Sequence, residues 1–301
     1  MALRRMLDVP APCKLNLFLH VTGRRPDGYH LLQSVFVLLD WADVLHFERR
    51  DDGRLSREDL GPALPEDDLS LRAARALQQA SGTPFGAHIG VDKRVPWGAG
   101  LGGGSSDAAT TLLALNRLWG LHWPRERLLE LALPLGADVP FFVGGRNAWV
   151  EGIGERLTPL DLAPRRFGLV KPPVAIPTAA IFGSPLLRRD TKPATVAVFL
   201  ADTRNFLAAS RNDLQPCAEA FSGEVGEALR FLPRRWPGIE RIRMSGSGST
   251  VFGEIGDTAG SSGGEPTAAQ AAEAGPATPG DGWVVREVVS LPFHPLVGWA
   301  D

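Results

Sequence analysis

The chain has 301 residues, of which 44% are apolar and 22% are charged, and its formal net charge at pH 7 is −2. This composition is typical of a globular protein with one or two ordinary cores, and the balanced charge excludes a broad basic surface for nucleic acid or anionic membranes. The two cysteines have no metal-type spacing, and no apolar run is long enough for a signal peptide or a membrane span. We therefore expect a cytoplasmic protein without nucleic-acid or membrane partners.

The first half of the chain predicts strands and helices in loose alternation. Residues 14–21 alternate as a strand, with one face formed by Leu15, Leu17, Leu19 and Val21 and the other by Lys14, Asn16, Phe18 and His20. A turn at Asp27-Gly28 leads to strand-like sequence that is broken at Asp40 and Asp43. Helices are predicted over 65–80, capped by Asp67 or Asp68, over 105–119 and over 124–133, with a strand over 87–95. Residues 136–145 are expected to form a loop, because Pro140 disfavours helical geometry at Val139.

The second half begins with a hairpin over 146–160 and a strand over 167–178 that opens a second unit. A glycine-rich turn in 229–255 is expected between a short helix and a strand, and 282–292 closes the chain as a strand. Between Gly256 and Gly282 the composition falls to small residues and proline, which indicates a surface loop with at most a short helix. This order of elements favours an α+β architecture in two lobes.

Five glycines occur in the seven residues from Gly98 to Gly104, directly before a predicted helix start. Residues 98–103 satisfy G-x-G-x-x-G, but no acidic residue follows at the end of a second strand, so a Rossmann site is excluded. The Walker and protein-kinase motifs are absent from the sequence as well. Free backbone N–H groups at a helix start form an anion site, whereas a flexible turn would need fewer glycines.

Other positions have a functional and a structural interpretation. Lys14 and Asn16 lie on either a solvated strand face or a phosphate site. Asp138 either caps a turn or acts as a general base. Tyr29, the only tyrosine, and the adjacent His30 either pack ordinarily or present a ring to a planar base. Thr178 and Phe182 could complete such a pocket. Gly246 and Gly248 allow close approach of either a ligand or a neighbouring strand.

Three stretches occur together: "PAPCKLNLFLHVTGRRPDGYH", "PWGAGLGGGSSDAA" and "MSGSGSTVF". With them the chain resembles the GHMP superfamily of small-molecule kinases. The agreement is closest with the diphosphocytidyl-methylerythritol kinases of the non-mevalonate isoprenoid route, through "KLNLFL", "DGYH", "LGADVPFFV" and "AIPTAAIF". The resemblance covers residues 11–252 and resumes near "VVSLPFHP". Two departures are Asp68-Leu69, where the family commonly has Asn-Leu, and Trp97, where it has a smaller side chain.

The resemblance implies a two-domain GHMP kinase fold. Residues 1–158 would form an N-terminal domain with a ribosomal-protein S5-like α/β unit, and residues 159–301 a ferredoxin-like α/β sandwich, with the ligands in the cleft between them. The chain would transfer the γ-phosphoryl group of ATP, with Mg²⁺, to the 2-hydroxyl of cytidine diphosphate methylerythritol. We expect these small molecules as partners, and a monomer or weak homodimer. Other GHMP acceptors (homoserine, mevalonate or a sugar) and a non-catalytic nucleotide-binding module remain the alternatives.

The resemblance also assigns residues. Asp138 would be the general base and Lys14 its charge-stabilising partner, with Ser105 or Ser106 near the magnesium ion. The ATP-binding set would be Lys93, Pro96, Gly98, Ala99, Gly100, Leu101, Gly102, Gly103, Gly104, Ser105, Ser106 and Asp107. The substrate would be held by Asn16, Tyr29, His30, Asp138, Thr178 and Phe182, with Tyr29 and Phe182 stacking the cytosine from opposite sides. Gly246 and Gly248 would form a supporting turn.

Overall fold

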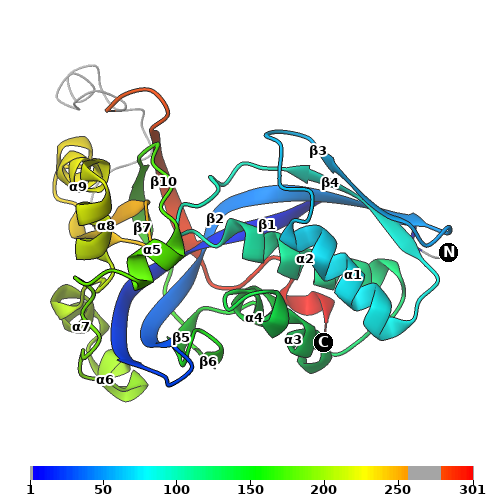
Figure 1. The fold of residues 1–301 in the computed structure, drawn as a ribbon, viewed down its shortest axis with the longest axis horizontal. Helices are drawn as coiled ribbons and strands as arrows, with labels where there is room; N and C mark the ends of the chain where they lie inside the picture. The colour runs from blue at the N-terminus through cyan, green and yellow to red at the C-terminus, as the bar shows by residue number, and fades with distance from the viewer. Residues whose placement is uncertain (1–2, 257–278, 301) are drawn as a thin grey trace.

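The structure of the protein is a computed structural model that describes residues 3–256 and 279–300. Within these residues, ten strands form one sheet in the order β3-β4-β2-β10-β7-β9-β8, with β1 and β5 paired to β2 and β6 paired to β5. The strands are β1 (Arg5–Arg24), β2 (His30–Arg50), β3 (Leu55–Asp59), β4 (Gly86–Asp92), β5 (Ala148–Glu151), β6 (Arg156–Pro159), β7 (Arg166–Lys171), β8 (Glu240–Met244), β9 (Val251–Ile255) and β10 (Val284–Leu291). Figure 1 shows β1 and β2 crossing from one half of the molecule to the other.

The hairpin of β1 and β2 differs from its sequence-based prediction in two respects. Its turn at Asp27-Gly28 is confirmed, but β2 continues without a break through Asp40 and Asp43. The strand register shifts between Asn16 and Leu19, where a β-bulge interrupts the alternation. Phe18 therefore packs in the same apolar cluster as Leu15 and Leu17, while Leu19 and Val21 belong to another cluster. The predicted two-faced strand is wrong beyond Asn16, because one inserted residue redirects every side chain that follows.

Four helices cover the sheet in the first half of the chain: α1 (Leu69–Ser81), α2 (Gly103–Leu118), α3 (Arg125–Leu135) and α4 (Val139–Gly144). Helix α2 contacts β1 and β2, and the other three pack around it (Figure 1). Asp68 caps α1 as predicted, by accepting from the backbone N–H groups of Ser70 and Leu71. The expected loop over 136–145 is wrong, because a proline in the first turn of a helix loses no hydrogen bond and so begins α4.

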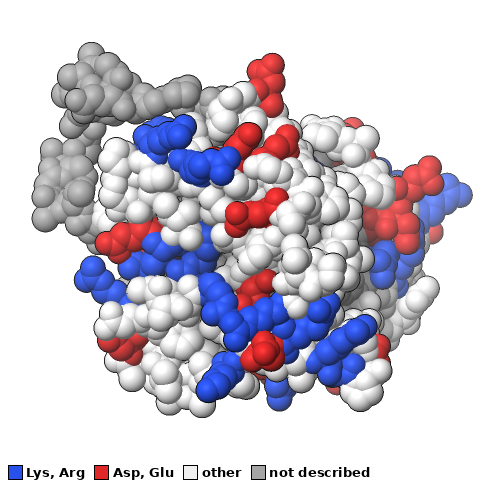
Figure 2. All heavy atoms as spheres, turned by 60° about the vertical axis from the view of Figure 1, so that its left-hand side comes forward, with Lys and Arg blue, Asp and Glu red and all other residues white. Residues whose placement is uncertain are grey.

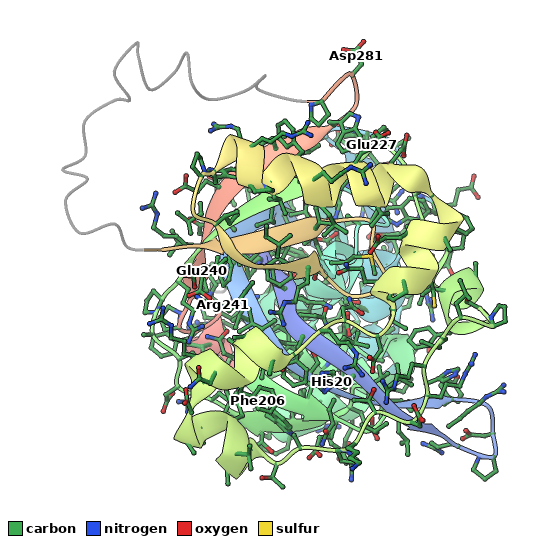
Figure 3. The ribbon with its side chains drawn as sticks, turned by 90° about the vertical axis from the view of Figure 1, so that its left-hand side faces the viewer. His20, Phe206, Glu227, Glu240, Arg241 and Asp281 are labelled. Carbon is green, nitrogen blue, oxygen red and sulfur yellow. The ribbon has the colours of Figure 1, made fainter. Side chains whose placement is uncertain are left out.

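The second half contains α5 (Thr178–Phe182), α6 (Val196–Ala201), α7 (Thr203–Ala209), α8 (Gln215–Phe221) and α9 (Gly223–Arg235). Helix α9 lies against β7, β8 and β9, as the yellow helices over the strands of Figure 3 show. The turn with Gly246 and Gly248 connects β8 to β9, not a helix to a strand as predicted. The unpredicted strand β8 is short and begins after the helix-breaking sequence Pro237-Gly238.

Three apolar clusters join these elements. The first lies under α1–α4, the third under α8 and α9, and the second connects β1 and β2 to β7, β9 and β10. The end of the chain returns to the first cluster: Leu296 and Ala300 are buried there, beside a 3₁₀ turn at Val297–Trp299 that contacts α2. The division of the chain at residues 158 and 159 stays a prediction.

Figure 2 shows acidic and basic side chains interspersed over the face that it presents, in keeping with the balanced net charge. In the part of the chain that the structure describes, none of the helices is long and apolar enough to cross a bilayer. The small-residue segment between Gly256 and Gly282, for which a surface loop with at most a short helix is predicted, lies mostly outside the described residues.

Candidate active site

A cleft of about 900 Å³ brings together most of the residues singled out in the sequence. Its walls include Lys14, Asn16, Tyr29, His30, Lys93, Pro96, Gly98, Ala99, Gly100, Leu101, Gly102, Gly103, Gly104, Ser105, Asp138, Thr178, Phe182, Gly246 and Gly248. Ser106 and Asp107 do not line the cleft, since both are buried in the first turns of α2. Asp68 does not line it either and instead pairs with Arg57.

The glycine segment forms one wall of the cleft and leads directly into α2. Helix α2 begins at Gly103, two residues before the predicted start. Its N-cap residue is Gly102, so no side chain accepts a hydrogen bond from the N–H groups of the first turn. The predicted cap residues Ser105, Ser106 and Asp107 therefore lie inside the helix. No side chain caps the first N–H groups of this 16-residue helix, which is the arrangement that an anion site at a helix start requires.

The two glycine-rich turns pack against each other. The Ser245 hydroxyl donates to the carbonyl oxygen of Gly100 at 3.0 Å, and the Thr250 N–H donates to that of Ala99 at 3.2 Å. Gly100 has a φ of +72°, and a Cβ added there would overlap the Ser245 carbonyl oxygen. The turn of Gly246 and Gly248 thus packs against the first glycine loop and also lines the cleft, and close approach of a ligand to it stays a prediction.

Lys14 and Asp138 meet across the cleft floor. The Lys14 Nζ lies 3.4 Å from the Asp138 carboxylate. Their side chains are 4% and 31% exposed, so the ammonium is enclosed while the carboxylate reaches the cleft. Lys14 is held from behind, because its Nζ also donates to Asn16 Oδ1 and lies 4.3 Å from the centre of the Phe36 ring. A buried cation beside a partly exposed carboxylate is suited to a reaction in which negative charge develops on the reacting group.

Lys93 forms a buried ion triad with Asp43 and Asp107 under the glycine segment. Burial alone would lower the pKa of Lys93, but Asp107 and Asp43 together raise it. Burial and the neighbouring Asp43 raise the pKa of Asp107, although Lys93 opposes this. Asp43 also accepts from the backbone N–H groups of Arg94 and Val95. The triad therefore ties β2, the end of β4 and the start of α2 together.

Another part of the cleft lining, the aromatic wall, consists of Tyr29, His30 and Phe182. Tyr29 is 60% exposed, and the half-buried rings of His30 and Phe182 are stacked with centroids 5.0 Å apart and planes at 28°. The Thr178 hydroxyl is hydrogen bonded to that of Ser247 at 2.9 Å, which joins α5 to the second glycine turn. Residues that are far apart in the sequence thus bring three rings to the lining of one cleft.

Three residues that sequence reasoning missed support the site. Asp43 was interpreted as a strand break, although an acidic residue inside an apolar strand could have signalled a buried ion pair. Asn212 donates to the carbonyl oxygens of Met244 and Gly246, each at 2.8 Å, and so holds the second glycine turn. Arg189 donates to His30 Nε2 at 3.0 Å. Neither Asn212 nor Arg189 belongs to a recognisable sequence pattern.

Comparisons with known proteins identify relatives along the whole chain. The family described as "GHMP kinases N terminal domain" matches residues 68–146. The 4-diphosphocytidyl-2-C-methyl-D-erythritol kinase of Methylibium petroleiphilum is 64% identical over 300 residues, which cover 100% of both chains. That of Variovorax paradoxus is 52% identical and covers 99% of this chain and 100% of the relative.

One solved structure is similar to this chain in both sequence and fold. A crystal structure of 4-(cytidine 5'-diphospho)-2C-methyl-D-erythritol kinase is 38% identical, with a TM-score of 0.70, over 83% of this chain and 89% of that chain. The family match, the mixed α/β fold and the full-length identity agree, and the chain belongs to the GHMP kinases, in the family of the 4-diphosphocytidyl-2-C-methyl-D-erythritol kinases.

Proposed function

We propose that the chain transfers the γ-phosphoryl group of ATP to the 2-hydroxyl of 4-diphosphocytidyl-2-C-methyl-D-erythritol, giving the 2-phosphate and ADP, in the synthesis of isoprenoid precursors. The full-length identity to kinases named for this substrate carries the proposal. The cleft supports it, since a paired basic and acidic side chain, a phosphate-type loop and aromatic rings all line one cavity.

The donor side of the cleft is the glycine segment. Its unoccupied backbone N–H groups and the start of α2 would hold the triphosphate without bulky side chains in the way. The proposed ATP-binding residues at the cleft surface are Pro96 and those of 98–105, together with Lys93. Ser106 and Asp107, although adjacent in sequence, would act from inside the helix by shaping its first turn.

Asp138 is the proposed general base and Lys14 the proposed charge-stabilising group. The Asp138 carboxylate would accept the proton of the acceptor hydroxyl as its oxygen attacks the γ-phosphorus. Lys14 would orient that carboxylate and offset the negative charge that spreads over the transferring group. Phosphoryl transfer depends mainly on position and charge, so this pair and the backbone cradle form a sufficient set.

The donor atoms at the cleft fit a magnesium ion carried by ATP. Mg²⁺ prefers oxygen ligands and keeps most of its shell as water and phosphate, so it needs few protein groups. The hydroxyl of Ser105 lines the cleft at the start of α2, whereas that of Ser106 is buried, which favours Ser105 of the two predicted candidates. The bound ion would reduce the charge on the phosphates.

The acceptor side is the aromatic wall of Tyr29, His30 and Phe182, where a cytosine would stack. Asn16 and Thr178 would position the rest of the substrate. Both cysteines are free and buried, which is typical of a protein from a reducing compartment. We therefore keep the cytoplasm as the expected location, with a monomer or weak homodimer as the expected state.

An ADP-release assay with three acceptors tests the function. The cytidine diphosphate substrate should support turnover, whereas mevalonate and homoserine have no base to stack and should give little ADP above the acceptor-free rate. Preferential turnover of mevalonate or homoserine would overturn the substrate assignment. Binding of ATP with no ADP release for any acceptor would instead support a nucleotide-binding module.

A further inference from the structure

Arg189 connects the two parts of the aromatic wall from behind. Its Nε donates to His30 Nε2 at 3.0 Å, while a terminal nitrogen donates to the carbonyl oxygens of Phe182 at 3.0 Å and Ser184 at 3.1 Å. The other terminal nitrogen donates to the Leu187 carbonyl oxygen at 3.0 Å. One guanidinium thus fixes the imidazole at the start of β2 and the end of α5.

The chemistry of the guanidinium determines the form of the imidazole. Arginine has donors only and stays charged, so the ring nitrogen that it contacts must be an acceptor. With Nε2 as acceptor, His30 is neutral and carries its proton on Nδ1. Burial and, to a smaller extent, the nearby charges of Arg189 and Arg24 lower the pKa of His30, which also favours the neutral ring.

The remaining nitrogen of His30 is available to a ligand. His30 lines the cleft, and among the described residues its Nδ1 has no hydrogen-bond partner. Stacking on Phe182 restricts the tilt of the ring, and Arg189 prevents its rotation by holding Nε2. His30 therefore offers one fixed N–H donor beside the stacking surface.

We propose that Arg189 is a positioning residue for base selection, because it keeps His30 as an Nδ1–H donor. Such a donor matches cytosine, whose ring N3 and carbonyl O2 both accept hydrogen bonds. It disfavours uracil at the N3 position, because uracil carries an N3–H donor there, and two facing donors leave both unpaired. This inference rests on the proposed function, since it assumes that the aromatic wall receives the base.

The first test compares the cytidine substrate with its uridine counterpart. The wild-type protein should prefer the cytidine form in kcat/KM, and Arg189→Met should reduce that preference by about tenfold or more, the typical worth of one good hydrogen bond. The KM for ATP should change little. Arg188→Met is the matched control, because Arg188 is 58% exposed and its one ion pair within the described residues is with Asp190. An unchanged preference in Arg189→Met would overturn the inference.

The second test needs no variant. Side-chain ¹⁵N shifts of His30 in the wild-type protein should show the Nδ1–H form, whereas free neutral histidine favours Nε2–H. Observation of the Nε2–H form would refute the role of Arg189, even if the Arg189→Met protein failed to fold. The two proposals fail differently: no turnover of either pyrimidine substrate contradicts the function, whereas turnover of both at equal kcat/KM contradicts only base selection.

Discussion

Single side chains at the cleft have separable tasks, and the pair of Lys14 and Asp138 is the clearest case. Asp138→Asn keeps the shape of the side chain but removes its basicity. We expect turnover to fall by about two to four orders of magnitude, the usual contribution of a general base, while ATP binding stays close to wild type. Turnover and nucleotide titration measure the two effects. Asp161→Asn serves as the control, because that carboxylate is 85% exposed; wild-type turnover in Asp138→Asn would exclude the base.

Variants of Tyr29 and Trp97 should have opposite effects on the binding of the cytidine substrate and of ATP. Both are exposed aromatic residues that line it, but Tyr29 follows the β1–β2 turn and Trp97 adjoins the glycine segment. Tyr29→Ala should raise the KM for the cytidine substrate by about tenfold or more, because base stacking on an aromatic ring contributes about 1–3 kcal/mol. Trp97→Ala should act mainly on the KM for ATP. Equal effects of Tyr29→Ala on both constants would contradict the stacking role.

At the level of elements, the contact between the two glycine turns depends on a missing side chain. Gly100→Ala should destabilise the fold by about 1–3 kcal/mol, because the added methyl group meets the Ser245 carbonyl oxygen and the φ of +72° is strained. Urea unfolding measures the loss. Gly144→Ala is a suitable comparison, since a Cβ there meets nothing within 4 Å, and its free energy of unfolding should stay near wild type.

The ion triad is the second link between elements. Lys93→Met would leave the buried carboxylates of Asp43 and Asp107 without their cation, so we expect a loss of about 3–5 kcal/mol in the free energy of unfolding near pH 8. The loss should shrink toward pH 5, because protonation of a carboxyl group relieves the repulsion. The same measurements on Lys192→Met, at an exposed lysine, should show no such loss. A deficit in Lys93→Met that does not depend on pH would argue against the triad.

Periodicity predicted most elements, because apolar spacing reports directly which face of a helix or strand is buried. It failed where a single local feature changed the outcome: the bulge after Asn16, and the helix start at Pro140. The chemistry of Lys14 and Asp138 was predicted through motifs, but their distance of 3.4 Å requires the fold. Arg189 was missed because its partner His30 lies 159 positions away, and spacing carries no information about such a contact.

At the level of the whole molecule, we expect His294 to make the free energy of unfolding depend on pH. Burial, aided by Arg125, lowers the pKa of His294 from 6.5 to about 3. The neutral ring therefore stabilises the fold above pH 6.5, and this contribution is lost as the pH falls toward 3. At pH 5 the loss amounts to about 2 kcal/mol. His294→Asn keeps an acceptor for the Leu296 N–H without titrating in this range.

Between pH 5 and 8, the free energy of unfolding should therefore change more steeply with pH in the wild type than in His294→Asn. The wild type should lose about 2 kcal/mol more than the variant on going from pH 8 to pH 5. Parallel curves for the two proteins would show that His294 is not the group responsible.

The return of the chain end to the first apolar cluster also has a consequence for biosynthesis. Strand β10 joins β2 to β7, the His294 N–H donates to the Gly145 carbonyl oxygen at 2.8 Å, and Leu296 completes the cluster around α2. These residues follow all the other elements of the first cluster along the chain. The half of the protein that is translated first therefore cannot close its core until β10 and Leu296 have been synthesised, and a nascent chain that stalls before β10 presents an open apolar surface to chaperones and proteases.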